Sequence, residues 1–423
     1  MASAPTAFQW IAAAIFALAV IHTFSTRFFS HLAHVQPRHA GLWHLLGEVE
    51  AVFGVWAVVL IAAMIFLRSP GQALEYFEGR DFTEPAFLFV VMVIAASRPV
   101  AEAAAMLLGG AARLLPFRET ISFYFCLLAI GPMLGSFITE PAAMTLCALL
   151  LRNRYMSGKT ATRFKYASLG ALFVNVSIGG VLTSYAAPPV LMVADTWNWD
   201  TTFMLTTFGW KAAIAVLVNA AVVTYLFRRD IGARPDWDAA DKDPDVPFVA
   251  IAVHLGFLAV VVIAGHHPLV FLGTFLFFLG YTEAYPRFQS PLILREGLMV
   301  AFFLAGLVTL GGQQEWWLRR VLSGLDPTAV FFGSAALTTI TDNAALTYLG
   351  SLIEDVSGAF QYSLVAGAVA AGGLTVIANA PNPAGFAILK GSFADGAISP
   401  LWLAVAAAGP TVVALLAFGV LPG

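Results

Sequence analysis

Long apolar runs, spaced along the whole chain, constrain the fold of this sequence more than any other feature. A helix that crosses the hydrocarbon core of a bilayer needs about 20 apolar residues. With 59% hydrophobic and 11% charged residues, the 423-residue chain has too little polar surface to coat a soluble protein. The sequence therefore predicts an all-α polytopic membrane protein. Runs that read as simple or broken spans lie near 7–25, 41–67, 86–108, 166–194, 204–227, 248–264, 269–283, 297–312, 359–390 and 401–420.

Two further apolar runs, 121–151 and 328–353, each carry a polar motif in the middle. The first contains TEPAAMT (Thr139–Thr145), and the second contains TDNAALT (Thr341–Thr347). A polar or proline-containing break at membrane depth is tolerated only where the backbone is buried in protein or lines a wet cavity. We therefore expect each run to form a re-entrant hairpin with the motif at its tip.

The placement of Lys and Arg supports the hairpin interpretation. Arg118 precedes the first hairpin and a dense basic cluster, 152–165, follows it. Because basic residues concentrate in cytoplasmic loops, both ends of this hairpin are expected inside. Following this topology along the chain puts the N-terminus outside and most of the 22 Lys and Arg residues inside. The basic residues then left outside are Arg68, Arg80, Lys211, Arg319 and Arg320.

The chain also reads as two repeats, 1–227 and 248–423, joined by a polar linker at 228–247. In each repeat a helix interrupted by glycine and proline follows the hairpin. The first, 166–194, contains GGVLTSYAAPPVLM, and the second, 359–390, contains GGLTVIANAPNPAGF. Paired interrupted helices at matching places indicate two inverted-topology repeats with a binding site near the midplane of the bilayer.

The tip motifs supply two carboxylates, Glu140 and Asp342, inside otherwise apolar sequence. A charged carboxylate at the centre of a bilayer costs about 2.5 kcal/mol or more, so one found there usually faces a partner, a cavity or an ion path. If Na⁺ and H⁺ compete for such a group, the proton leaves when the cation arrives. We expect Asp342 to be this group, with Glu140 in a similar role or setting the ion ratio. The alternative is that both residues only cap the helices that start after them.

Residues with neutral side-chain oxygens, mainly Thr and Asn, lie near these carboxylates in the sequence or in the interrupted helices. A Na⁺ site is expected at Asp342, Asn343 and Asn379, completed by Thr341, because hard cations prefer oxygen ligands. The prolines near Asn379 free backbone groups that could also meet an ion, although proline kinks that only shape packing are the alternative. The other predicted site residues are Thr139, Thr145, Thr183, Ser184, Thr347 and Asn382.

With these motifs in place, the chain resembles the ion transporter superfamily, and the TEPAAMT and TDNAALT pair is similar to its sodium/proton antiporters. The resemblance implies a scaffold domain, here including helices within 1–108, and a moving transport domain of two opposed hairpins and two broken helices. It also implies a homodimer in a bacterial-type plasma membrane. Relatives include arsenite permeases and sodium-coupled dicarboxylate carriers. The dicarboxylate carriers have Ser-Asn-Thr tips, from which Thr139-Glu140-Pro141 and Thr341-Asp342-Asn343 depart.

The expected function is therefore a secondary active transporter that exchanges Na⁺, or another monovalent cation, for H⁺ by alternating access. A sodium- or proton-coupled carrier of a small anion is the alternative, but two carboxylates without a neighbouring Lys or Arg would repel an anion. We expect no enzyme, because neither HExxH nor GxSxG occurs, and no cofactor besides the transported ions. The lack of a basic stripe argues against nucleic acid. The role of one histidine cluster stays open: His31, His34, His39 and His44.

Overall fold

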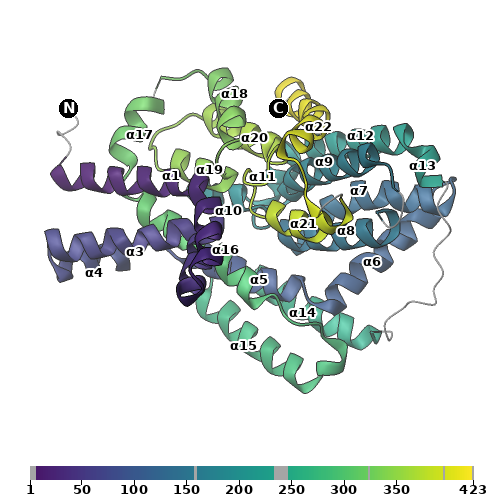
Figure 1. Ribbon diagram of the computed structural model, residues 1–423, viewed down its shortest axis with the longest axis horizontal. Helices are drawn as coiled ribbons and strands as arrows, with labels where there is room; N and C mark the ends of the chain where they lie inside the picture. The colour runs from purple at the N-terminus through teal and green to yellow at the C-terminus, as the bar shows by residue number, and fades with distance from the viewer. Residues whose placement is uncertain (1–5, 157–159, 233–245, 323, 394–395, 422–423) are drawn as a thin grey trace.

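The structure is a computed structural model that describes residues 6–156, 160–232, 246–322, 324–393 and 396–421. Within these residues the chain forms helices, turns and loops, with no strand. The helices build an elongated body with α1, α3 and α4 at one end and α13 at the other (Figure 1). Five described helices are long and apolar enough to cross a membrane, or up to seven if two bent helix pairs each count as one span. The chain is a multi-pass membrane protein.

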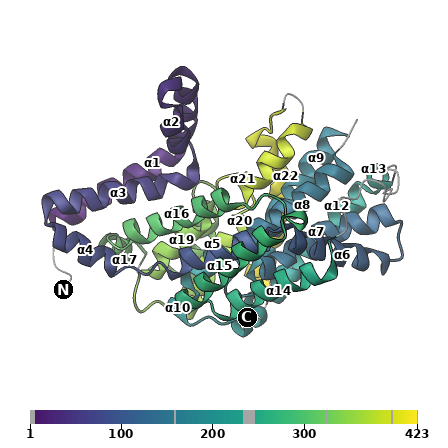
Figure 2. The ribbon, with the colours of Figure 1, turned by 90° about the horizontal axis from the view of Figure 1, so that it is seen from below.

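The apolar run at 41–67 is not one straight helix as predicted. It forms α2 (Ala40–Leu46) and the longer α3 (Val49–Leu67), and the two are bent by 99°. The helix ends at Gly47, and Glu48 has an extended backbone. As a result α2 projects from the body, whereas α3 lies along α1 (Ala7–Val35) (Figure 2).

The run at 86–108 is likewise two helices, α5 (Thr83–Ala95) and α6 (Arg98–Arg113), bent by 67°. Pro99 lies in the first turn of α6. A proline has no N–H to donate and disfavours a helical conformation in the residue before it, so the first helix cannot continue through this point. The predicted span at 86–108 is therefore bent at this point, and the pair can still cross the membrane as one broken span.

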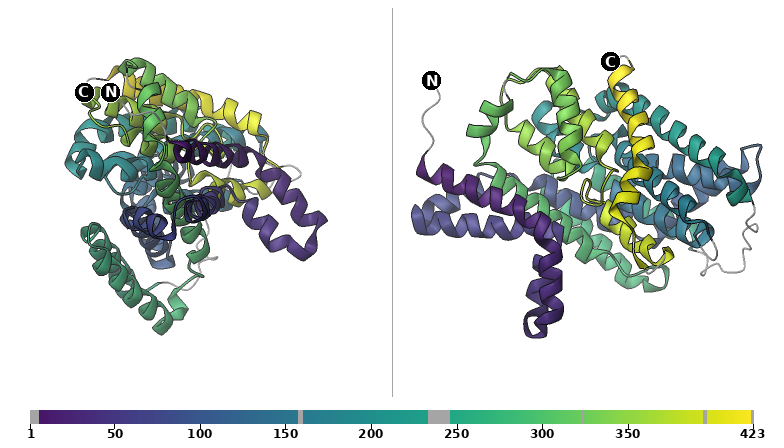
Figure 3. Two further views of the ribbon diagram at one scale, coloured as in Figure 1. Left: turned by 90° about the vertical axis from the view of Figure 1, so that its left-hand side faces the viewer. Right: turned by 45° about the horizontal axis from the view of Figure 1, so that its top comes forward.

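One hydrophobic core joins these N-terminal helices to α14, α15 and α16. The backbones of α3 and α16 touch, because a Cβ atom at Gly306 would overlap the backbone of Phe53 and Gly54. Figure 3 shows α14 and α15 as a pair of helices at the edge of the body. The bounds of the remaining helices in this part are α4 (Pro70–Glu78), α14 (Phe248–Ile263), α15 (Pro268–Ala284), α16 (Leu294–Gly311) and α17 (Glu315–Leu322).

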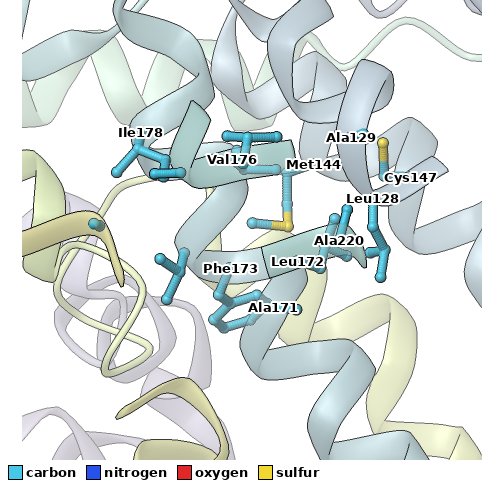
Figure 4. Close-up of a cluster of buried hydrophobic side chains, with 14 of the residues drawn as sticks. Leu128, Ala129, Met144, Cys147, Ala171, Leu172, Phe173, Val176, Ile178 and Ala220 are labelled. Carbon is cyan, nitrogen blue, oxygen red and sulfur yellow. The ribbon is translucent and has the colours of Figure 1, made fainter. Parts of the chain in front are cut away.

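A second hydrophobic core holds most of the first hairpin and of both broken helices, and the residues at the two hairpin tips pack in the first core. Figure 4 shows its centre, where Leu128, Met144 and Phe173 from three different helices lie in one cluster. Its first set of helices is α7 (Glu119–Ile138), α8 (Glu140–Tyr155), α9 (Thr162–Gly179), α10 (Pro188–Trp197), α11 (Thr201–Met204) and α12 (Trp210–Leu226). Its second set is α18 (Pro327–Thr338), α20 (Gly358–Ala371), α21 (Asn382–Leu389) and α22 (Pro400–Val420), whereas α19 (Asn343–Ser351) contributes to the first core.

The two halves of the chain pack against each other in a reciprocal way. Helix α10, which ends the first broken helix, packs on α19 of the second hairpin, and α21, which ends the second broken helix, packs on α8 of the first hairpin. Two related repeats would pack in this reciprocal way. That the repeats have inverted topologies in the membrane stays a prediction. The expected linker begins as the short helix α13 (Arg228–Gly232), and its residues 233–245 lie outside the described part of the chain.

Two contacts between helix ends that are far apart in the sequence agree with the predicted topology. In each contact, the distribution of basic residues places both helix ends on the same side of the membrane. Arg118 donates to the Gly232 carbonyl at 2.7 Å between two ends expected inside. His266 lies 3.3 Å from Asp195 between two ends expected outside. The predicted topology is therefore compatible with the packing of the helices.

Candidate functional site

The first hairpin consists of α7 and α8, which lie side by side and are joined directly at Thr139. Its two ends meet, because the Tyr155 hydroxyl donates to the Thr120 carbonyl at 2.7 Å. At the tip, Thr139 has φ of 70° and ψ of 150°. Only glycine adopts this region readily, and another residue there costs of order 1–3 kcal/mol. The strained turn puts Glu140 in the first position of α8.

The second hairpin consists of α18 and α19, and Val330 near its start and Ile353 near its end belong to one hydrophobic cluster. Its tip is different. Asp342 is half-buried and caps α19, its Oδ1 accepting from the backbone N–H groups of Ala344 at 2.8 Å and Ala345 at 3.1 Å. The capping role considered for this carboxylate is thus present in the structure.

The break in the first interrupted helix is fastened to the first hairpin. Helix α9 ends at Gly179, a 3₁₀ turn follows, and the chain is extended at Thr183 before α10 begins at Pro188. Ser136 of α7 accepts from the backbone N–H of Leu182 at 2.8 Å and donates to the Gly179 carbonyl at 2.7 Å. The Thr183 hydroxyl donates to the Ser136 carbonyl at 2.6 Å.

The break in the second interrupted helix, residues 372–381, lies beside both hairpin tips. The backbone N–H of Asn343 donates to the Ala378 carbonyl at 3.1 Å, and the Thr375 hydroxyl donates to the Thr339 carbonyl at 3.0 Å. Asn382 folds back across the break and donates to the carbonyls of Gly372 and Thr375. These bonds hold the irregular backbone in one place.

Glu140 is the centre of this arrangement. Its side chain is fully buried, and the Asn379 amide donates to its Oε2 at 2.8 Å across 239 residues of sequence. Its carboxyl fills the space beside Gly180, where a Cβ atom would overlap it. Its Oε1 has no hydrogen-bond partner among the described residues. Asp342 is close enough to interact with it electrostatically.

Several other fully buried polar atoms near the tips also lack a hydrogen-bond partner within the described residues. Buried polar groups are nearly always paired in folded proteins, so a group of unpaired ones needs an explanation. Most are oxygens, which can bind a cation. The atoms are Thr139 Oγ1, Asn379 Oδ1, Asn382 Oδ1 and both side-chain polar atoms of Asn343.

A small cavity of about 20 Å³ lies between Asp342, Asn379 and the α16 side chains Val300 and Phe303. A cavity needs about 10–15 Å³ to hold one water molecule. The space therefore suits a single water molecule or a small cation next to the second tip.

The structure separates the predicted site residues into two groups. Glu140, Asn379, Asn343, Asn382 and Thr139 lie at the tips and the second break with free polar atoms. The hydroxyls of Thr145 and Thr347 donate to carbonyls of their own helices, Ser184 lies near the Thr201 hydroxyl, and Thr341 lies half-buried at the second tip. Asn379, expected on Asp342, donates to Glu140 instead.

Sequence reasoning did not identify Ser136, Gly180 and Gly372 as site residues. Ser136 holds the first break, Gly180 makes room for the Glu140 carboxyl, and Gly372 lies against Asn343 and Ser177. A signal existed for the glycines, since a Gly-Gly pair opens both interrupted motifs, at 179–180 and 372–373. Nothing in the sequence distinguishes Ser136 from an ordinary buried serine.

The histidine cluster contributes no metal centre to the described residues, in which no group of three or more His, Cys, Asp or Glu side chains is placed to hold a metal ion. His31 and His39 are exposed near the junction of α1 and α2. The side chain of His34 lies outside the described part of the structure.

Comparison with known protein families gives a match that covers nearly the whole chain. The model of a family described as "Putative Na+/H+ antiporter" matches residues 7–421. The chain belongs to this antiporter family. A search of the curated proteins finds no match. An antiporter is a transporter rather than an enzyme, and the family name agrees with the membrane-spanning helices and with the expected ion substrates.

Proposed function

We propose that this protein exchanges Na⁺, or another monovalent cation, for H⁺, and that both ions bind at the Glu140 carboxyl. The observation that carries the proposal is the state of this side chain. It is fully buried, one oxygen is held by Asn379, and the other has no partner among the described residues. Asp342, which the sequence favoured, is half-buried and caps a helix.

Burial supports an exchange mechanism because a bare carboxylate in a dry site is unfavourable. A bound proton neutralises Glu140, and so does a bound monovalent cation, but the two together would leave an uncompensated positive charge. The site therefore holds one or the other. Asn379 keeps the carboxyl in place in both states through its amide N–H.

The neutral ligands of the cation would come from the unpaired oxygens around this group. Asn379 Oδ1 and Thr139 Oγ1 belong to residues adjacent to Glu140 in space or in sequence, and both are buried. Asn343 and Asn382 offer further amide oxygens beside the second break. Such an all-oxygen set favours a hard cation. Asp342 adds negative charge nearby and favours cation binding without being the exchange group.

Alternating access would move the hairpins and broken helices as one body against the helices of the N-terminal core. Most of the two interrupted helices packs in one hydrophobic core and the N-terminal helices in another, although residues at both hairpin tips, Ala143 and Ala344 among them, belong to the N-terminal core. Both hairpins would be re-entrant, the repeats inverted, and two copies of the chain would associate through the static part in a bacterial-type plasma membrane. Each of these features is an expectation from the family resemblance and from the sequence pattern.

The anion carrier is the less favoured alternative. An anion would use the N-terminus of a hairpin helix, where free N–H groups point outward. The Asp342 carboxylate already accepts from the first N–H groups of α19, and Glu140 stands in the first turn of α8. Neither cavity at the breaks is lined by Lys or Arg within the described residues.

The test uses proteoliposomes that contain a pH-sensitive dye. An inwardly directed Na⁺ gradient should move H⁺ out through the wild-type protein, and K⁺, Li⁺ and anions added in turn define the substrate. Glu140→Gln keeps the shape but not the titratable group, and it should abolish the movement. Glu283→Gln, an exposed position in α15, is the matched control and should behave as wild type. Sodium-driven H⁺ movement through folded Glu140→Gln protein would overturn the proposal.

A further inference from the structure

A second, larger cavity lies away from the small pocket at the second tip. It has a volume of about 640 Å³ and opens between the start of α5, the end of α10 with the following turn, and the turn between α14 and α15. Thr83, Trp199 and Gly265 represent these three walls. The cavity thus lies between the two hydrophobic cores.

Part of the lining of this cavity comes from the irregular segment that also contacts the buried Glu140 carboxyl. Ser184 and Tyr185, from the break in the first interrupted helix, line the cavity. Ser184 follows Thr183, whose hydroxyl is bonded to the first hairpin, and stands four residues after Gly180, which touches the Glu140 carboxyl. The same irregular segment of chain thus lines the cavity at Ser184 and touches the Glu140 carboxyl at Gly180.

The charges on the cavity wall are mainly acidic. Glu84, Asp195 and Asp200 line it together with His266, and the described lining contains no Lys or Arg. His266 lies 3.3 Å from Asp195, and Glu84 interacts electrostatically with Asp81, Asp195 and His266. A cleft lined by one sign of charge raises the local concentration of the opposite ion.

The position of the basic residues assigns this cavity to the outer side. The positive-inside rule predicts that the start of α5, the end of α10 and the turn between α14 and α15 all face the outside.

We infer that the large cavity is the outer vestibule of the transporter. The transported cation reaches the Glu140 site through this vestibule, and the carboxylates of Asp195 and Asp200 concentrate it there. The identity of the ion rests on the proposed function, whereas the accessibility of the vestibule does not.

Thiol labelling tests the accessibility without any transport assay. The native Cys126 and Cys147 are buried, so the wild-type protein serves as the unlabelled background. Single cysteines are introduced at Ser184 in the irregular segment and at Thr202 on the exposed rim. Arg118→Cys, at the expected inner end of α7, is the control for the opposite side.

A membrane-impermeant thiol reagent added outside should label Ser184→Cys and Thr202→Cys and leave Arg118→Cys unlabelled. In inside-out vesicles the pattern should reverse. Labelling of Thr202→Cys from the inner side would overturn the assigned side of the vestibule. Labelling of Thr202→Cys but not of Ser184→Cys from outside would show that the cavity does not reach the break, which also contradicts the inference.

The electrostatic part is tested by the cation concentration that gives half-maximal exchange. Asp195→Asn and Asp200→Asn should each raise this concentration about twofold at low ionic strength, the order of effect expected when one nearby unit charge is lost in water. The maximal rate should not change. In about 1 M choline chloride the effect should vanish, because the Debye length falls to about 3 Å. Exchange with an unchanged half-saturation concentration would refute this role, even if the labelling pattern were as expected.

Discussion

Gly180→Ala is the change that most sharply tests the geometry around Glu140. The added methyl group would overlap the Glu140 carboxyl, including its Oε1, Cγ and Cδ atoms. The carboxyl has little freedom to move away, because it is fully buried and its other oxygen is held by Asn379. The substitution should therefore displace the group to which the ions bind while it leaves every charge in place.

The size of the effect follows from the cost of overpacking. Adding a methyl group to a tightly packed interior costs typically about 1–3 kcal/mol. Since about 1.4 kcal/mol corresponds to a factor of ten, exchange should fall roughly 5- to 150-fold if the cost is expressed at the ion site. Sodium-driven H⁺ movement in proteoliposomes measures the loss, and a thermal melt separates it from general unfolding.

Gly273→Ala provides the matched control. This glycine is also helical, in α15, but a Cβ atom there would meet no atom within 4 Å. It should transport like the wild type, and its helix should gain up to about 1 kcal/mol from the better helix former. If Gly180→Ala also transported like the wild type, the contact between Gly180 and Glu140 would have no part in ion binding, and the proposed site would be misplaced.

Three further predictions address the hairpin tips and the pH dependence of the fold. Thr139→Gly should raise the melting temperature, because it relieves a backbone strain of order 1–3 kcal/mol, and should weaken cation binding by removing the hydroxyl; a lower melting temperature would argue against strain. Asp342→Ala should lower the stability by about 1 kcal/mol through loss of the helix cap, whereas Asp342→Asn should keep the cap and raise only the half-saturating cation concentration. Equal destabilisation by both, measured in a thermal melt, would contradict this. Hydrogen bonds from the backbone of Ala329 and Thr328 lower the pKa of the Asp326 carboxyl. Its contribution to stability is therefore present above the unfolded pKa of about 3.9 and lost as the pH falls through the lower folded value. Asp326→Ala should melt earlier than the wild type at pH 7, and the difference should narrow only below about pH 4; a constant difference down to lower pH would exclude this origin.

Much of the fold could be predicted because bilayer chemistry leaves a strong trace in sequence. The apolar runs 121–151 and 328–353 each form two helices that are divided at the polar motif, and the re-entry of these segments into the membrane stays a prediction. The bends at Gly47 and before Pro99 could not be seen in hydropathy, since apolar residues continue on both sides of each bend. Pro99 was the visible signal for the second bend, but proline also occurs inside straight spans, as Pro410 does in α22.

The sequence predicted which residues belong to the candidate site, but not which of them contact one another. The motifs supplied Glu140, Asn379 and Asn343, which the structure brings to one place. Which hairpin tip meets which broken helix depends on the packing of α21 on α8, across more than two hundred residues of chain. For this reason sequence assigned Asn379 to Asp342, while the structure joins it to Glu140.

Proton release on cation binding tests the central claim most directly. In the proposed mechanism Na⁺ displaces the proton of Glu140, so adding Na⁺ to the purified protein in weakly buffered detergent solution should release H⁺ in an amount equivalent to the bound cation. A pH indicator follows the release, and choline chloride controls for ionic strength. Folded Glu140→Gln protein should release none, whereas Asp342→Asn should still release it at a higher Na⁺ concentration. Undiminished release from Glu140→Gln would contradict the assignment of Glu140 as the shared binding group.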